Sequence, residues 1–235
     1  WAPTPELLDA AGPLDGLVVA SPSNPTGSVL SAERVAMVVA WCAEHGVQLV
    51  ADEIYHGITY GDPAPTVLAA TRDAVVVNSF SKYYSMTGWR LGWMVVPHHL
   101  RDAVERLQQN LYICAPHVSQ VAGLAAFDAT VELDGHVRRY AANRDLLTAG
   151  LAAAGITEVA AADGAFYVYA DVTGLAEAAG GSMALCGQWL DQLGVAATPG
   201  LDFDLVRGHR FVRFSYAGSA EHIAEACGHL QRWAR

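Results

Sequence analysis

The chain has 235 residues, of which 52% are hydrophobic, enough to build one large domain or two smaller ones around an apolar core. Its 24 acidic and 14 basic residues give a net charge of −10 without any lysine- or arginine-rich run, so a nucleic-acid partner is not expected. No apolar run reaches the roughly 20 residues that span a bilayer and no secretory leader is recognisable, so we expect no membrane segment and a cytoplasmic location.

Short apolar runs alternate with amphipathic stretches in the first half of the chain, a pattern typical of βα units on a mostly parallel sheet. After a connector at residues 2–5, strands are predicted at residues 17–20, 47–51, 74–77 and 91–96. Ser31 is predicted to cap the helix between the first two strands, and Gly46 is predicted to end it. Two further helices are predicted at residues 98–111 and 118–127.

The second half of the chain predicts a smaller α+β domain. A long helix through residues 137–151 leads toward Gly155, and is followed by strands at 166–169 and 211–215 and helices at 182–193 and 220–233. The predicted fold class is therefore α/β, with a mostly parallel sheet and flanking helices over residues 1–130. The smaller domain is predicted over residues 131–235 and includes the long linking helix.

The four cysteines, Cys42, Cys114, Cys186 and Cys227, lie far apart in apolar or helical stretches and form no Cys-x-x-Cys pair. They are predicted to be buried free thiols in a reducing compartment. No His-Glu-x-x-His or comparable ligand spacing occurs, so no metal is predicted.

Three polar clusters each follow one of the predicted strands. They are Asn24-Pro25-Thr26-Gly27, Asp52-Glu53-Ile54-Tyr55 and Ser79-Phe80-Ser81-Lys82, the last followed by Arg90 between two glycines. In an open α/β sheet, ligands bind at the carboxyl ends of the strands, so clusters far apart in sequence can meet there. The position of the clusters therefore indicates one shared site.

These residue types suit a phosphorylated pyridine aldehyde. Lys82 could form a Schiff base with the aldehyde, and the positive charge of Arg90 would favour its free amine. Ser79, Ser81 and Arg90 could bind the phosphate, and a buried Asp52 could keep the pyridine nitrogen protonated. Tyr55 and Asn24 could donate to the phenolic oxygen of the ring. The cofactor predicted from the residues is pyridoxal 5′-phosphate.

Each cluster has an ordinary explanation when it is taken alone. Asn-Pro-x-Gly is a turn signal, Asp-Glu after a strand is commonly a helix cap, and a lysine after Ser-x-Ser usually lies at the surface. Glu53 should point to the opposite side from Asp52, and His56 is expected to be solvated or at the edge of the core. The order of the three clusters, each at a strand end, favours the cofactor site.

The three clusters with Arg90 resemble the signature of fold-type I pyridoxal-phosphate aminotransferases of class I/II, and the resemblance covers essentially the whole chain. It implies that Lys82 anchors the cofactor and then carries a proton between the substrate and the cofactor. It also implies that Arg213 binds the substrate α-carboxylate and that Asn24 is a second substrate-binding residue. The substrates implied are an amino acid and a 2-oxo acid, and the protein implied is a homodimer. Gly164-Ala165-Phe166-Tyr167 and Thr198-Pro199-Gly200 resemble loops that line the family's site.

One departure concerns the start of the chain. Family members carry roughly another domain of about 100–150 residues ahead of the first motif, and this chain opens with Trp1 rather than Met. We therefore expect a truncated or processed product of a longer transaminase, in which the chain alone could be inactive.

Two other functions stay open at this point. Carbon–sulfur lyases and decarboxylases share the fold and much of the signature. A transaminase-like sensor domain of a DNA-binding regulator is the second alternative. Product analysis would separate a lyase from a transaminase, and the upstream sequence would reveal a regulator.

Overall fold

The computed structural model describes residues 2–234, so the prediction made from Trp1 lies outside the described residues. The chain divides into two compact units. The first unit comprises Trp1–Pro22 and Val29–Val137, and the second comprises Ser23–Ser28 and Arg138–Arg235. The short Ser23–Ser28 segment, which includes Asn24, therefore packs with the C-terminal part of the chain.

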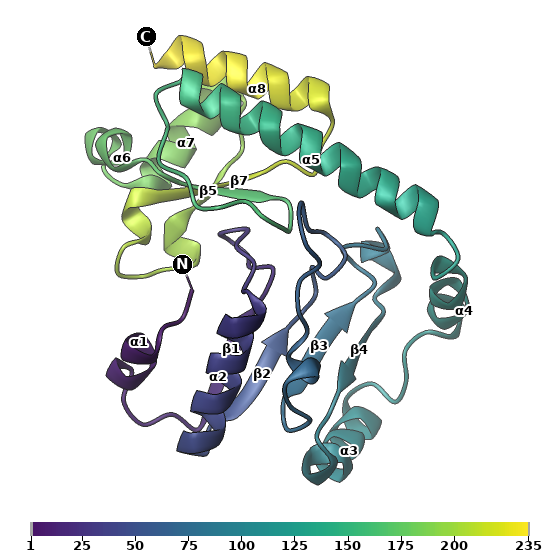
Figure 1. Ribbon diagram of the computed structural model, residues 1–235. Helices are drawn as coiled ribbons and strands as arrows, with labels where there is room; N and C mark the ends of the chain where they lie inside the picture. The colour runs from purple at the N-terminus through teal and green to yellow at the C-terminus, as the bar shows by residue number, and fades with distance from the viewer. Residues whose placement is uncertain (1, 235) are drawn as a thin grey trace. The chain divides into compact units, whose positions relative to one another are not determined.

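The first unit is built on a four-stranded sheet in the order β1-β2-β3-β4. Its strands are β1 (Gly16–Ala20), β2 (Gln48–Asp52), β3 (Val75–Ser79) and β4 (Gly92–Val95). β1, β2 and β3 are parallel, whereas β4 runs antiparallel to β3 (Figure 1). The prediction of a mostly parallel sheet is confirmed.

The helices of the first unit include α2 (Ala32–His45), α3 (Arg101–Leu111) and α4 (His117–Ala126). Short 3₁₀ turns lie at Val67–Ala69, Thr87–Trp89 and His98–Leu100. The predicted ends of α2 are confirmed: the Ser31 side chain accepts from the Arg34 N–H, and Gly46 ends the helix in the left-handed conformation. The apolar face of α2 packs on the sheet, where Val35, Val38 and Cys42 join Leu49 and Val76 in one buried cluster.

The predicted connector at residues 2–5 leads directly into a helix, α1 (Pro5–Ala10), which the sequence reasoning missed. Thr4 caps it by accepting from the Leu7 N–H, and Pro5 occupies the first turn, where the N–H that proline lacks has no helical partner. Leu8 joins the core, and Asp9 accepts a hydrogen bond of 2.7 Å from the Trp41 indole. These tertiary contacts stabilise a helix that is too short to be evident from periodicity.

The second unit contains a three-stranded antiparallel sheet in the order β5-β7-β6. Its strands are β5 (Tyr167–Asp171), β6 (Thr198–Pro199) and β7 (Phe211–Ser215), and its helices are α6 (Thr173–Ala179), α7 (Ser182–Leu193) and α8 (Ala220–Trp233). Short 3₁₀ turns lie at Gly200–Asp202 and Gly208–Arg210. The smaller α+β domain is confirmed as part of the fold class, and α7, β7 and α8 have the predicted limits.

The long predicted helix is α5 (Thr130–Ala153), and the division between the two units falls inside it, between Val137 and Arg138. Gly150 allows α5 to approach α8, because a Cβ atom at this position would lie 2.6 Å from the Cβ of Cys227. Trp189 of α7 is fully buried, with its ring 5.7 Å from that of Phe214 on β7. Close helix contacts and buried aromatic rings therefore form the core of the second unit.

Three of the four cysteines are buried free thiols, as predicted. Cys114 is exposed, so the prediction of burial was wrong for this residue. It lies in the turn between α3 and α4, where Tyr112 and Ile113 are exposed as well. The apolar sequence around Cys114 suggested burial, but a turn on the surface of the unit places these side chains outside its core.

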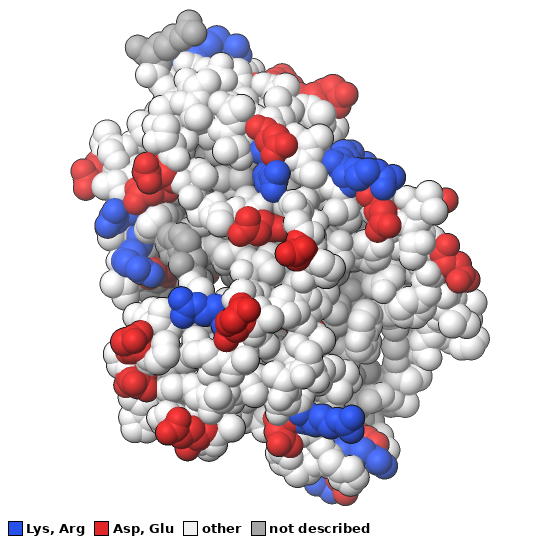
Figure 2. Space-filling model, in the orientation of Figure 1, with Lys and Arg blue, Asp and Glu red and all other residues white. Residues whose placement is uncertain are grey.

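Charged side chains of both signs are interspersed on the face shown in Figure 2. Several pair at the surface, including Arg101 with Glu105 and Arg144 with Asp145. Exposed pairs of this kind contribute little to stability, on the order of 0–1 kcal/mol each. Among residues 2–234, no helix has both the length and the apolar composition needed to cross a membrane.

Candidate functional site

The first group of predicted site residues lies at one edge of the parallel strands. In the register of β1, β2 and β3, Ala20 is opposite Asp52, and Asp52 is opposite Val77. β1 and β2 therefore end at the same level, at Ala20 and Asp52, and β3 continues two residues further at the same edge, to Ser79. We call Asp52, Tyr55, Ser79, Ser81, Lys82 and Arg90 the lysine cluster.

Lys82 lies in the tight connection that follows β3. The Lys82 carbonyl accepts from the Ser85 N–H at 3.1 Å, and the Thr87 hydroxyl donates to the Ser81 carbonyl at 2.8 Å. The half-buried Lys82 side chain places its Nζ atom 5.6 Å from the centre of the buried Tyr55 ring. The structure thus brings the lysine of one cluster and the phenol of another close together.

Two serines and an arginine flank this connection. The Ser79 hydroxyl donates to Ser81 Oγ at 2.9 Å and accepts from the Ser81 N–H at 3.0 Å, so the two side chains are adjacent. Arg90 adopts the left-handed conformation, with φ of 51°, and its exposed guanidinium donates to the Thr87 carbonyl. No carboxylate of the described residues forms an ion pair with it. Two hydroxyl groups and an uncompensated positive charge are suitable ligands for a phosphate.

The two neighbouring carboxylates, Asp52 and Glu53, have different environments. Half-buried Asp52 accepts from the Ile54 N–H through Oδ1 at 3.1 Å. Glu53 is buried, accepts from the Val67 N–H at 2.8 Å and lies 3.4 Å from the His56 imidazole. Burial lowers the pKa of His56, and the Glu53 carboxylate acts in the opposite direction. Glu53 is thus occupied by internal contacts, which leaves Asp52 as the candidate for cofactor chemistry.

The second group of predicted site residues lies in the second unit. Arg213 of β7 donates to Asn24 Oδ1 at 2.8 Å through Nη1, across a sequence separation of 189 residues. Its Nη2 atom donates to the Thr198 hydroxyl at 3.1 Å. We call Asn24, Tyr167, Thr198, Phe203 and Arg213 the arginine cluster.

Strand register explains why these side chains meet. Arg213 is opposite Thr198 of β6 on one side and Tyr169 of β5 on the other, and Tyr167 is two residues from Tyr169 on the same face of β5. The Arg213 guanidinium carbon lies 4.4 Å from the centre of the Tyr167 ring and 4.9 Å from that of Phe203. Both distances are in the range of cation–π contacts.

The sequence reasoning missed one member of this group, Phe203. It follows the Thr198-Pro199-Gly200 segment, whose resemblance to a site loop was recognised, but no spacing or motif in the sequence points to the aromatic ring. In the described part of the chain, no group of three or more His, Cys, Asp or Glu side chains could hold a metal ion.

The comparison with known proteins identifies the family. The sequence model described as "Aminotransferase class I and II" matches residues 6–230, nearly the whole chain. The chain belongs to the class I and II aminotransferase family. The predicted resemblance and the α/β fold are thereby confirmed.

Among aminotransferase relatives, valine–pyruvate aminotransferase of Mycobacterium tuberculosis is 49% identical over 99% of this chain and 61% of its own length. A putative aminotransferase of Silicibacter pomeroyi has a solved structure with a TM-score of 0.93 at 48% identity, over 99% of this chain and 62% of its own. The solved structure of aspartate aminotransferase of Thermus thermophilus with maleate gives a TM-score of 0.88 at 32% identity, over 98% of this chain and 60% of its own. The chain therefore spans about three fifths of the length of these aminotransferases.

Proposed function

We propose that a protein carrying this chain is a pyridoxal-phosphate-dependent aminotransferase that moves an amino group from an L-amino acid to a 2-oxo acid. The observation that carries the proposal is the shared edge of β2 and β3, where Asp52 ends β2 and the turn bearing Lys82 follows the adjacent strand. The family membership adds independent support. An amine, a carboxylate and a phosphate-binding set at one sheet edge are the groups that this cofactor requires.

The residues of the lysine cluster fit the cofactor. Lys82 would hold it through the ε-amine, and Ser79, Ser81 and Arg90 would bind its phosphate. The fit rests on the adjacent serine hydroxyls and on the guanidinium of Arg90, which has no carboxylate partner among the described residues. Asp52 would face the pyridine nitrogen, and Tyr55 would donate to the phenolic oxygen.

When bound, pyridoxal phosphate supplies an electron-accepting ring that stabilises negative charge at the substrate α-carbon. Asp52 would support this role by keeping the ring nitrogen protonated. Lys82 would also move a proton between the substrate α-carbon and the cofactor, first as base and then as acid. The Tyr55 ring, 5.6 Å from Nζ, would restrict where the amine moves.

The arginine cluster would bind the substrate carboxylate. Arg213 is half-buried, and its two terminal nitrogens donate to neutral oxygens of Asn24 and Thr198. No acidic side chain of the described residues compensates its charge. A guanidinium with remaining N–H donors and no paired carboxylate suits the planar α-carboxylate that amino acids and 2-oxo acids share.

The relatives suggest which substrates to test first. Valine and pyruvate are named for the Mycobacterium tuberculosis relative, which shares 49% of aligned residues with this chain. We propose valine as amino donor and pyruvate as acceptor, a homodimeric assembly and a cytoplasmic location. The three buried free thiols agree with a reducing compartment.

Covalent trapping of the cofactor tests the proposal directly. Lys82 is the only lysine of the 235 residues, so borohydride reduction with pyridoxal phosphate should label one peptide of this chain. The protein as encoded should gain visible absorbance with the vitamer, lose it on titration with valine and recover it with pyruvate. Lys82→Ala should abolish the labelled peptide and lower transaminase turnover by about 10⁴-fold or more, about 5.5 kcal/mol of lost barrier reduction.

A matched control makes the result decisive. Arg72→Ala removes a cation that lies outside the lysine cluster, so this variant should keep both the label and turnover. The proposal is wrong if the label appears elsewhere in the protein, or if Lys82→Ala keeps normal turnover.

A further inference from the structure

Phe203 and Tyr167 contact the guanidinium of Arg213 in a way that the carboxylate-binding role alone does not require. The guanidinium carbon lies 4.4 Å from the Tyr167 ring centre and 4.9 Å from the Phe203 ring centre. Hydrogen bonds to Asn24 and Thr198 fix the two terminal nitrogens within the guanidinium plane. Two acceptors and two rings therefore restrict both the direction and the tilt of this group.

The loop that carries Phe203 is itself tightly held. Gly200 and Gly208 approach so closely that a Cβ atom on Gly200 would lie 2.5 Å from the Gly208 carbonyl oxygen. That carbonyl also accepts a buried hydrogen bond of 2.9 Å from the Ser182 hydroxyl of α7. The Phe203 N–H donates to the Gly200 carbonyl at 2.9 Å. The base of the loop, and the backbone of Phe203 with it, is thus fixed to the body of the second unit.

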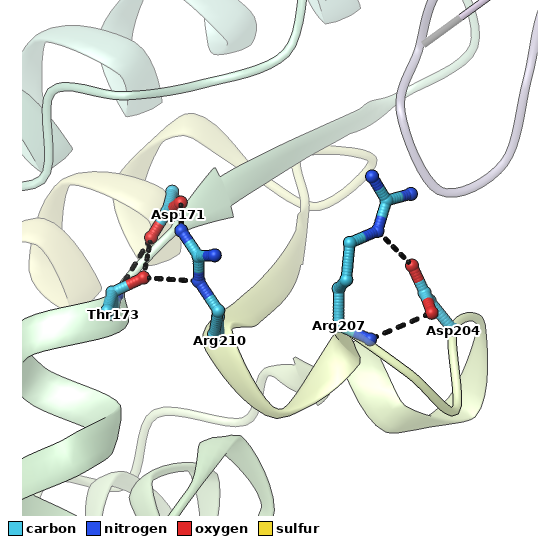
Figure 3. A network of polar contacts seen from close by, with 5 residues as sticks. All are labelled: Asp171, Thr173, Asp204, Arg207 and Arg210. Atoms are coloured by element: carbon cyan, nitrogen blue, oxygen red, sulfur yellow. Dashed lines mark hydrogen bonds and ion pairs between the residues drawn. The ribbon is translucent and has the colours of Figure 1, made fainter.

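Asp204 closes the tip of the same loop. Its Oδ1 atom accepts from the Val206 and Arg207 N–H groups at 2.9 Å. Its Oδ2 atom accepts from Arg207 Nε at 3.0 Å, and both contacts between Asp204 and Arg207 are drawn in Figure 3. The hydrogen bond from the Arg207 backbone is the main cause that lowers the pKa of Asp204, so the carboxylate stays ionised at neutral pH. A second network seen in Figure 3, in which Arg210 binds Asp171 and Thr173, joins the end of the loop to β5 and α6. The loop is therefore ordered around Phe203 from both sides.

The Phe203 ring meets a second ring as well as the arginine. It lies edge to face with Tyr169, at 6.3 Å between ring centres and an interplanar angle of 89°. Tyr169 in turn stacks on Phe211, with 5.0 Å between ring centres. Since Tyr169 and Phe211 are buried, this chain of rings links the half-buried Phe203 to the core of the second unit.

We propose that Phe203, together with Tyr167, is a positioning residue that holds the Arg213 guanidinium in one orientation for the carboxylate of the amino acid and 2-oxo acid. This inference rests on the proposed carboxylate-binding role of Arg213. The physical basis is preorganisation: an arginine that is already oriented loses less conformational freedom when the anion binds. The aromatic faces also stabilise the cation while no anion is present.

The test uses Phe203→Leu in the protein as encoded, saturated with pyridoxal phosphate. Loss of the ring should raise KM for valine and pyruvate about tenfold, in keeping with the size of a partly buried cation–π contact, while kcat changes less than twofold. The Kd of 3-methylbutanoate, which has the carboxylate of valine without its amine, should rise by a similar factor. Phe203→Tyr, which keeps an aromatic ring, should restore both values.

Isobutylamine separates a carboxylate effect from general damage, because it is valine without the carboxylate. Its slow half-reaction should be unchanged in Phe203→Leu. Leu205→Ala, a change in the same loop at a side chain that is 88% exposed, should behave as the parent with all ligands. The inference is overturned if Phe203→Leu binds 3-methylbutanoate normally, or if it slows isobutylamine as much as valine.

Arg213→Lys distinguishes failure of this inference from failure of the proposed function. If Arg213→Lys leaves KM for valine and pyruvate unchanged, the carboxylate-binding role is wrong and the inference falls with it. If Arg213→Lys raises both KM values while Phe203→Leu does not, only the positioning role of Phe203 is refuted.

Discussion

Asn143 provides a quantitative test of how the second unit holds the strand that carries Arg213. This residue of α5 is only 1% exposed, and its side-chain amide donates to the carbonyls of Tyr216 and Gly218, both at 3.0 Å. Those carbonyls belong to the segment directly after β7. One buried side chain therefore fastens the end of β7 to the long helix.

The expected cost of Asn143→Ala follows from the burial of the two acceptors. The hydrogen bond to Tyr216 is buried, so its carbonyl would lose a partner without gaining water, at about 1–3 kcal/mol. The bond to Gly218 is partly buried, so water can replace the amide there and the loss should be about 1 kcal/mol. Together the free energy of unfolding should fall by about 2–4 kcal/mol.

Urea unfolding followed by tryptophan fluorescence measures this difference. The midpoint should fall at an unchanged slope, because a change in slope would indicate altered denatured-state structure or loss of two-state behaviour. Asn110→Ala is the matched control: Asn110 also donates from a helix to a backbone carbonyl, that of Arg106, but at an exposed position. Its substitution should cost less than about 0.5 kcal/mol. Equal effects of the two substitutions would refute the argument from burial.

Two further predictions concern single positions. Burial lowers the pKa of His56, so the unfolded chain binds a proton at this site more readily than the folded chain. The free energy of unfolding should therefore fall as the pH drops below about 6.5, the ordinary pKa of histidine. His56→Gln should make this fall smaller. Unfolding at pH 7.5 and 5.5 measures this, and identical pH dependence in parent and variant would contradict it. Gly27→Ala should lower the thermal unfolding temperature more than Gly46→Ala does. Both glycines have positive φ, so a side chain strains the backbone at either position. Only at Gly27 would the new Cβ also contact backbone atoms, 2.9 Å from the Tyr167 carbonyl oxygen. Similar losses, each of about 1–2 kcal/mol from backbone strain alone, would exclude the packing contribution.

Local signals predicted the elements whose ends are chemically marked. The limits of α2 follow from Ser31 and Gly46, both of which act on the backbone within one helical turn. α7, β7 and α8 are equally clear, because their hydrophobic periodicity extends over whole elements. α1 and the exposure of Cys114 were missed, since they depend on contacts with other segments or on the surface position of a turn.

The sequence by itself was enough to predict the lysine cluster as a candidate site. Parallel strands joined by helices end at the same sheet edge, so Asp52 and Lys82 could be placed near each other from chain order alone. No such rule connects Asn24 with Arg213, which are 189 residues apart, or brings Phe203 to the same guanidinium. Only the tertiary structure decided those contacts. They depend on the antiparallel pairing of β6 with β7 and on the packing of Ser23–Ser28 within the second unit, and neither can be predicted from the local sequence.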